Sequence, residues 1–250
     1  MYYFPNKGEI TSQAEFINFY DQCYYLYVSP SKEKEIEEIL KGSKSLNKQN
    51  IIKILEWKTG GKYDNAIKRL TNPYGSISYT TICQIEEAVK TQKRDKIMSE
   101  TEAKNLLKTL LKFDGIGPVY AITLLYFITR GQYPIYDKFA HIAIVVIYNQ
   151  KQYGSIIYDR YLNRNTPLSD GPEQTVYLNS IDLKEKGSNE PKGQAIDKLF
   201  SDYHDHYLTP LNTLFHCEYG KDFNTDRRID RALWVYGHLF NENERNKERT

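Results

Sequence analysis

The sequence has little of what would place a protein in a membrane or outside the cell. Its 250 residues include three cysteines, at positions 23, 83 and 217, which lie too far apart for a local zinc or iron–sulfur loop. The longest strictly apolar run, residues 142–148, is far shorter than the roughly 20 residues that cross a bilayer. The first residues lack the basic start and apolar segment of a secretory signal. We therefore expect a cytoplasmic protein with no membrane span and no cysteine-bound cluster.

The chain also has little net charge, because 34 Lys and Arg face 32 Asp and Glu. The charge is unevenly spread: residues 41–120 carry 15 basic and 8 acidic side chains. This local excess supports contact with nucleic acid, although a solvated helix face also collects lysine. Aromatic residues are abundant, with 22 Tyr and 10 Phe. Tyrosine suits both base stacking and ordinary protein cores, so its abundance decides little about function.

Most of the chain is predicted to be helical. Residues 12–15 and 99–102 have the Ser-x-x-Glu form of a capping box, in which both side chains satisfy free backbone N–H groups at a helix start. After the second box, apolar residues recur at helical spacing: Ala103, Leu106, Leu107, Leu110 and Leu111. Similar patterns cover about 13–27, 32–41, 48–57, 63–70, 80–90, 118–130, 138–149, 192–216 and 226–240. In the last of these we expect the arginines at 227, 228 and 231 to be exposed.

The most specific pattern lies in residues 106–147. The helix just described is followed by a Gly115-Ile116-Gly117 turn, a second helix, and a Pro-Ile-Tyr-Asp sequence that ends at Asp137 and opens a third helix. Glycine permits a tight turn whose bare N–H groups, at the start of the second helix, can bind a phosphate. A Gly-x-Gly turn alone would say little, since most such matches are plain turns.

Taken as a whole, this string resembles the helix-hairpin-helix DNA glycosylase superfamily. The family signature is a helix, a Gly-hydrophobic-Gly hairpin, a second helix with an early alanine, and an aspartate that opens the next helix. The residues that match it are Leu110, Gly115, Ile116, Gly117, Ala121, Pro134 and Asp137. Segments 51–58 and 65–70 look like the first helices of the same module. The resemblance implies an all-α, two-lobed protein with a hairpin module at 42–149 and a second lobe formed by 1–41 and 191–245. Residues 150–190 contain several Asn, Pro and Gly and have no helical period, so we expect an irregular insertion or a long loop there.

The resemblance also implies that Asp137 is catalytic. Breaking the bond between base and sugar generates an oxocarbenium-like sugar, which a nearby carboxylate can stabilise. Asp137 can also orient or deprotonate the attacking water. The alternative is that Asp137 only caps the helix that begins at Lys138, and the two roles are compatible.

Position 119 bears on a second activity of the family. Members that nick the DNA backbone carry a lysine two residues after the second hairpin glycine, where its amine forms a Schiff base. Val119 occupies that position here and cannot act as a nucleophile. The resemblance therefore implies a monofunctional glycosylase without lyase activity, in a lineage without an iron–sulfur cluster.

Double-stranded DNA is the implied partner, and two sets of residues are expected to contact it. The backbone contacts are expected from Gly115, Ile116, Gly117, Val119, Lys112 and Lys138. The pocket for a flipped base, or the wedge that replaces that base in the duplex, is expected from Trp57, Lys58, Tyr74 and Tyr136. The alternatives are a core tryptophan, a solvated lysine and an exposed turn tyrosine.

No cofactor is expected, and a monovalent cation at the hairpin is left open. His204 and His206 resemble metal ligands, but residues two apart face away from each other on a helix and no third ligand is evident, so no metal site is predicted. We expect a monomer.

The sequence thus predicts a glycosylase that flips out a damaged or modified base and hydrolyses its glycosidic bond. A modified base in viral DNA, removed as a defence, is one version of this function. One alternative is a non-catalytic helix-hairpin-helix protein that only grips DNA, and another is a hairpin that serves protein packing. Pocket shape, which the motif does not encode, sets the choice of base.

Overall fold

The computed structural model of the chain describes residues 2–4, 8–10, 12–58, 78–92, 94, 96–153, 191–215 and 223–247. The secondary-structure elements of the described residues are helices, apart from a small antiparallel hairpin of β1 (Tyr2–Phe4) and β2 (Gly8–Ile10), in which Tyr3 pairs with Glu9. The helices are α1 (Gln13–Tyr24), α2 (Pro30–Lys41), α3 (Lys48–Lys58), α5 (Tyr79–Val89), α6 (Glu100–Leu111), α7 (Pro118–Ile128), α8 (Lys138–Tyr153), α10 (Gly193–Tyr203), a π-helical turn (His204–Leu208), α11 (Thr209–Phe215) and α12 (Phe223–Lys247). The expected all-α class is confirmed, and the β-hairpin was not foreseen.

The local signals of the sequence account for several helix starts. Ser99 Oγ accepts a hydrogen bond from the Glu102 N–H, and the Glu102 carboxylate accepts one from the Ser99 N–H at 2.8 Å, so the capping box of α6 is present. The face of α6 that was predicted to be apolar is buried. α7 is buried on nearly every side, as expected for a helix that is apolar all round.

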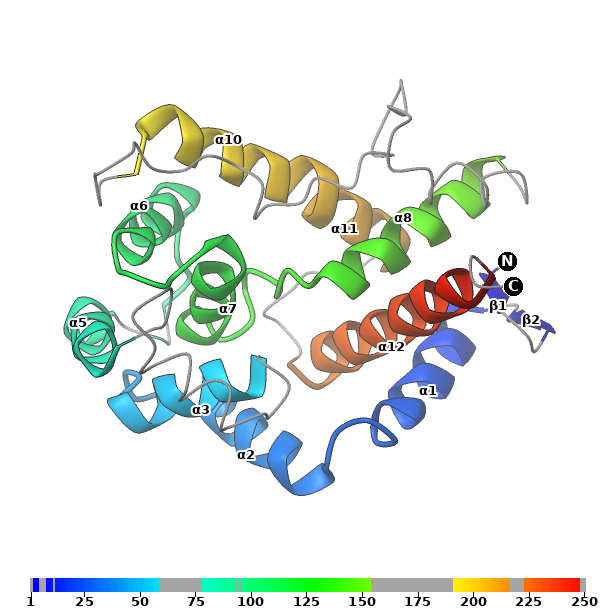
Figure 1. Cartoon of the computed structure of the whole chain (residues 1–250), viewed down its shortest axis with the longest axis horizontal. Coiled ribbons are helices and arrows are strands. Elements are labelled where there is room, and N and C mark those ends of the chain that lie inside the picture. The colour runs from blue at the N-terminus through cyan, green and yellow to red at the C-terminus, as the bar shows by residue number, and fades with distance from the viewer. Residues whose placement is uncertain are drawn as a thin grey trace.

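The helices fall into two groups, which Figure 1 shows side by side. In one group, α7 packs on α2, α3 and α6, and α10 covers α6. In the other, α12 lies between α1 and α8, and α11 packs on α8. From the sequence, α2 and α10 were expected in the second lobe and α8 in the hairpin module. In the structure, α2 and α10 contact helices of the predicted hairpin module, and α8 contacts helices of the predicted second lobe.

Parts of two predictions fall outside the described residues. α8 extends to Tyr153 and includes the first residues of the expected insertion, whose remainder, 154–190, lies outside the described part. The helix expected at 63–70 and the turn that contains Tyr74 also lie outside it.

Tyrosine contributes heavily to the core. Among the described residues, five tyrosines have fully buried side chains: Tyr20, Tyr126, Tyr203, Tyr207 and Tyr236. At the contact of α8 with α12 the helices approach closely, because a Cβ at Gly237 would overlap the carbonyl group of Phe139. Among the described residues, no helix combines the length and the apolarity needed to cross a membrane.

Candidate functional site

The glycine turn joins α6 to α7 as the hairpin motif requires. Gly115 has a φ of 77°, in the left-handed region that favours glycine. Ile116 points into the core and is buried, and Gly117 is the N-cap residue of α7, followed by Pro118 in the first turn. Val119 is half-buried and packs against the core. The turn therefore exposes Gly115 while its central side chain anchors it to the protein.

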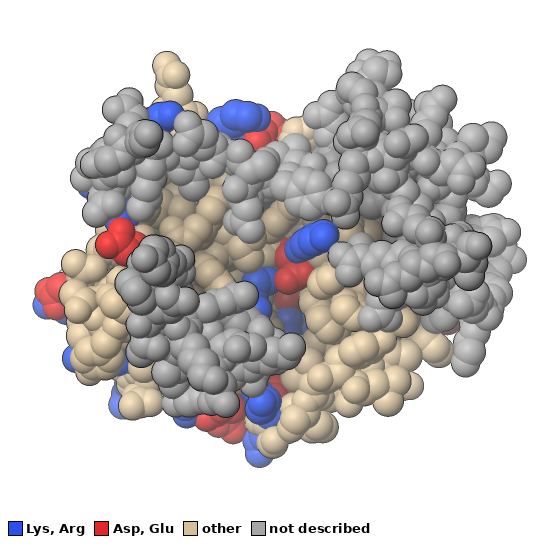
Figure 2. Space-filling view, viewed as in Figure 1, with Lys and Arg blue, Asp and Glu red and all other residues tan. Residues whose placement is uncertain are grey.

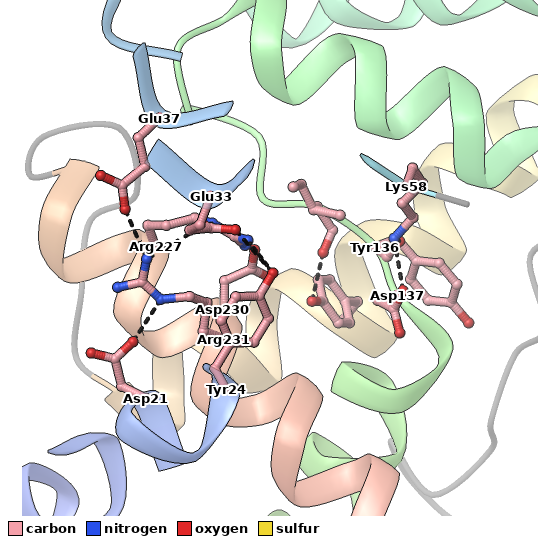
Figure 3. Close-up of polar contacts among 12 residues, drawn as sticks. Asp21, Tyr24, Glu33, Glu37, Lys58, Tyr136, Asp137, Arg227, Asp230 and Arg231 are labelled. Carbon is pink, nitrogen blue, oxygen red and sulfur yellow. Dashed lines mark hydrogen bonds and ion pairs between the residues drawn. The ribbon is translucent and has the colours of Figure 1, made fainter. Parts of the chain in front are cut away.

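Asp137 lies at the start of α8 and is held by two hydrogen bonds. Its Oδ1 accepts from the backbone N–H of Phe139 at 2.8 Å, which confirms that Asp137 caps the helix. Its Oδ2 accepts from Lys58 Nζ, also at 2.8 Å, in an ion pair that Figure 3 shows. The Asp137 side chain retains 21% of its accessible surface, whereas that of Lys58 retains 8%. The carboxylate is thus fixed in orientation and still reachable from solvent.

Lys58 reaches Asp137 from a different helix, the C-terminal end of α3. Its ammonium group also donates to the carbonyl oxygen of Tyr136 at 3.2 Å. The two residues are 79 positions apart in sequence. The structure therefore brings together two of the residues singled out from sequence, the predicted catalytic aspartate and the predicted pocket lysine.

Buried tyrosines hold the segment that leads to Asp137. Tyr203 donates to the carbonyl oxygen of Pro134 at 2.5 Å, and Tyr207 donates to that of Ile135 at 2.7 Å. These bonds satisfy backbone groups that would otherwise be buried without partners. The backbone just before Asp137 is consequently tied to α10 and to the π-helical turn.

Tyr136 points into the protein core. Its hydroxyl group lies 3.0 Å from His141 Nδ1, and its ring packs edge-on against Tyr207. Burial, reinforced by nearby His206, lowers the pKa of His141 to about 3, so this imidazole is neutral at pH 7. Tyr136, which was expected in the pocket or as a wedge, contributes its backbone carbonyl to the site.

A cavity of about 810 Å³ opens beside Asp137. Asp137 and Lys58 form part of its wall. The wall also contains aromatic side chains, those of Tyr24, Tyr27, Trp57, Trp234 and His238, and further charged ones, those of Lys32, Glu35, Lys53, Glu56, Arg227 and Asp230. In Figure 2, acidic and basic side chains meet in a hollow near the middle of the molecule, between uncharged surfaces. The predicted pocket residue Trp57 thus lies in the cavity wall, while it also packs against the core.

One part of the aromatic wall is a stack of rings. The rings of Trp234 and His238 are nearly parallel, with centroids 5.1 Å apart and an interplanar angle of 8°. Tyr27 packs edge-on against both, and Phe139 packs edge-on against His238. Since Phe139 also donates to Asp137, the stack is directly connected to the residue that caps α8.

Beneath the cavity, Arg227 is buried and fully engaged. It donates to Glu33 at 2.6 Å, to Asp230 at 2.5 Å and to the Tyr24 hydroxyl at 3.2 Å. Its guanidinium group also lies over the Trp57 ring, 4.8 Å from the centroid. Arg227 therefore joins α12 to α1, α2 and α3 at the floor of the cavity.

Arg231 extends this network along α12. It pairs with Asp21 at 2.6 Å and with Glu37 at 2.8 Å, and it approaches Glu33 at 3.4 Å. Burial opposes ionisation of Glu33, but Arg227 and Arg231 outweigh it and lower the pKa of that carboxyl group. The network in Figure 3 consequently ties the last helix to the first two through ionised side chains.

The expected exposure of the arginines was wrong for two of them. Arg227 and Arg231 are buried, at 4% and 5% exposure, because carboxylates on α1 and α2 compensate their charge, and Asp230 on α12 accepts a further hydrogen bond from Arg227. Arg228 is only partly exposed and pairs with Asp21 at 3.0 Å. The spacing offered a signal for this burial. Residues 227, 231, 234 and 238 share one helix face, and the large apolar side chain of Trp234 on that face indicates that it packs against the protein.

The remaining candidates lie apart from Asp137 or outside the described residues. Lys138 begins α8 and lies over the ring of Phe139, and Lys112 is the C-cap residue of α6. His204 is exposed beside Asp205. Within the described residues, no three His, Cys, Asp or Glu side chains come close enough to bind a metal ion. Tyr74 is outside the described part of the chain.

No protein-family model, no curated protein and no solved structure matches the chain. The likeness to glycosylases therefore stays a prediction carried by the hairpin motif and by the site around Asp137.

Proposed function

We propose that this protein is a monofunctional DNA glycosylase that uses Asp137 to hydrolyse the bond between a flipped base and its sugar. The observation that carries the proposal is the position of Asp137, a solvent-accessible carboxylate in the wall of a cavity of about 810 Å³. The same residue follows the glycine hairpin at the spacing of the glycosylase signature. The cavity supports the proposal because an enzyme that acts on a base must first receive it outside the duplex.

In this mechanism Asp137 acts on the sugar. As the glycosidic bond breaks, positive charge develops on the sugar, and a carboxylate beside it is stabilising. The Phe139 N–H and the Lys58 ammonium group each occupy one oxygen of Asp137 and fix its plane. A carboxylate has about four acceptor positions, so both oxygens can still accept a proton from the attacking water.

The cavity wall supports binding of a large, flat base. Its volume lies in the upper part of the roughly 300–1,000 Å³ typical of small-molecule sites. Trp57 and the stacked pair Trp234 and His238 provide ring surfaces against which a base can pack. We therefore propose a damaged or modified base as the substrate, with modified bases of viral DNA among those to be tested.

The test is mass spectrometry of the free bases that the protein releases from duplex DNAs carrying oxidised, alkylated, mismatched or naturally modified bases. Release of one base, with an abasic site left in the strand, is the expected result. If the protein releases none of these bases, the glycosylase proposal fails and the non-catalytic DNA-binding protein described below becomes the better candidate.

Borohydride trapping tests separately whether the protein removes the base without forming a Schiff base, the step that leads to cleavage of the DNA backbone. No covalent DNA adduct is expected, because Val119 occupies the position of the family's amine. Lys58 is the amine nearest Asp137 among the described residues. An adduct that forms with the wild-type protein and is lost in Lys58→Ala would refute the monofunctional assignment and identify the nucleophile.

A second candidate is a non-catalytic DNA-binding protein. The observation that favours it is that both oxygens of Asp137 already have structural partners, one in a helix cap and one in an ion pair. This candidate predicts duplex binding that weakens with salt and no base release, by the wild-type protein or by Asp137→Asn.

A further inference from the structure

The wall of the cavity that contains Asp137 holds three further carboxyl groups, of Glu35, Glu56 and Asp230, and among these three Asp230 is the buried one. It lies on α12, and its side chain retains 10% of its accessible surface. Its Oδ2 accepts a hydrogen bond from Arg227 Nη1 at 2.5 Å. Within the described part of the chain, this is the hydrogen bond that Asp230 makes, so Oδ1 carries none. The two carboxyl groups therefore differ: both oxygens of Asp137 are engaged, whereas Asp230 has one oxygen available to the cavity.

Asp230 has the weakest charge compensation in the network of α12. Among the ion pairs of the described residues, Arg227 alone reaches Asp230 and is shared with Glu33, whereas Asp21 pairs with Arg228 and Arg231, and Glu37 pairs with Arg231 and Lys41. Glu33 is the best compensated of the four, because both Arg227 and Arg231 reach it and the Tyr24 hydroxyl donates to it at 3.0 Å. A buried charge without a full counter-charge is costly, and a proton on one carboxyl group removes that cost.

The groups that face Asp230 make it the member that holds this proton. Burial raises the pKa of Asp230 above its ordinary value, and the nearby charge of Asp137 acts in the same direction. Arg227, on the same helix, and Lys58, on α3, act in the opposite direction but do not outweigh the burial.

Asp230 also has phenols as neighbours. Tyr126 on α7, Tyr203 at the end of α10 and Tyr207 in the π-helical turn are fully buried, and burial raises the pKa of each. These three side chains are therefore neutral and add no charge that would ionise Asp230.

We infer that Asp230 is the general acid that protonates the departing base, while Asp137, paired with Lys58, acts on the sugar. The inference rests on the proposed glycosylase function and assigns a second carboxyl group of that site. Arg227 holds Oδ2, so the proton lies on Oδ1, the oxygen available to the cavity. The different surroundings of the two carboxyl groups thus allow one to donate a proton to the base and the other to act on the sugar.

The proton transfers balance. The glycosidic C–N bond breaks, its electron pair goes to the base, and the Oδ1 proton of Asp230 passes to a ring nitrogen or carbonyl oxygen of that base. Water adds to the sugar carbon, and its proton passes to Asp137. Asp137 then releases its proton to solvent, and Asp230 takes up a proton from solvent. The net reaction consumes one water molecule and yields the free base and an abasic sugar.

Two substitutions separate this role from a structural one. Asp230→Asn keeps the shape of the neutral acid but cannot donate its proton. Asp21→Asn removes a carboxylate from the same network at a residue that does not line the cavity. With the base found by mass spectrometry as substrate, Asp230→Asn should lower the rate by about 10²-fold or more. The wild-type rate should fall at alkaline pH as Asp230 ionises, and this alkaline limb should be absent from Asp230→Asn but present in Asp21→Asn.

A direct measurement does not depend on the substrate. In protein labelled with ¹³C at the aspartate carboxyl carbons, the NMR signal that disappears in Asp230→Asn should show a protonated carboxyl group at pH 7. An ionised Asp230 at pH 7 would overturn the inference, as would an Asp230→Asn enzyme with the wild-type rate and alkaline limb. If the wild-type protein releases no base from any DNA, the glycosylase function fails, while the NMR signal still decides whether Asp230 holds a proton.

Discussion

Replacing Gly237 with alanine should destabilise the protein, although alanine is the better helix former. Gly237 lies within α12, where it faces the start of α8. A Cβ at this position would overlap the carbonyl oxygen of Phe139 and would lie 2.6 Å from its carbonyl carbon. Both atoms are backbone, so no side-chain rotation can relieve the overlap.

The magnitude follows from the required movement. The two helices must separate by at least about 0.8 Å to bring the carbon–carbon distance to 3.4 Å, the lower bound of ordinary contacts, and by more to clear the oxygen. Overpacking of this kind costs about 3 kcal/mol at the upper end of its usual range. Alanine recovers about 1 kcal/mol through its helix propensity. We therefore expect a net loss of about 2 kcal/mol in the free energy of unfolding.

Equilibrium denaturation with urea measures this loss, and Gly193 provides the matched control. A Cβ at Gly193, the first residue of α10, meets no atom within 4 Å, so Gly193→Ala should keep or raise the midpoint. The Gly237 variant should also release bases more slowly, because α8 begins next to Asp137 and a misplacement of about 1 Å can cost 10²-fold in rate. A Gly237→Ala protein as stable as the wild type would refute the close approach of α8 and α12.

Two further substitutions test the buried polar groups. Burial first, and then His206, lower the pKa of His141 to about 3; an unfolded histidine titrates near 6.5, so between these values the unfolded chain binds the extra proton and stability falls as the pH decreases. At pH 5 the wild type should have lost about 2 kcal/mol relative to pH 7, and His141→Gln should lose less; equal losses in urea denaturation would contradict this assignment. Arg94 is buried and donates to the carbonyl oxygens of Phe127, Ile39, Leu40 and Lys44. Arg94→Met leaves these acceptors without their donor and should cost about 3 kcal/mol or more, so an unchanged urea midpoint would be inconsistent with the structure.

The sequence predicted the features that depend on nearby residues. The capping box at Ser99, the buried face of α6 and the turn at Gly115 each follow from side chains within a few positions of one another. Helix propensity, capping and glycine conformation act over that range. The resemblance of the string to a glycosylase signature likewise depended on local spacing and singled out Asp137.

The sequence could not predict the contacts that fold distant segments together. The pair of Lys58 with Asp137 joins residues 79 positions apart, and the pair of Arg227 with Glu33 joins residues 194 positions apart. An arginine on a helix is expected to be exposed until its partners are known, which is why the burial of Arg227 and Arg231 was missed. Asp230 was missed for the same reason, since its importance comes from its place in the cavity wall and from a single arginine partner that it shares with Glu33.

The most direct test of the account compares wild-type protein with Asp137→Asn on the same duplex DNA. Both proteins should bind the duplex with similar affinity, because the hairpin at Gly115 is unchanged. The wild type should release a free base and leave an abasic site, and Asp137→Asn should release none. Base release by Asp137→Asn at the wild-type rate would contradict the central claim that this carboxylate performs the reaction.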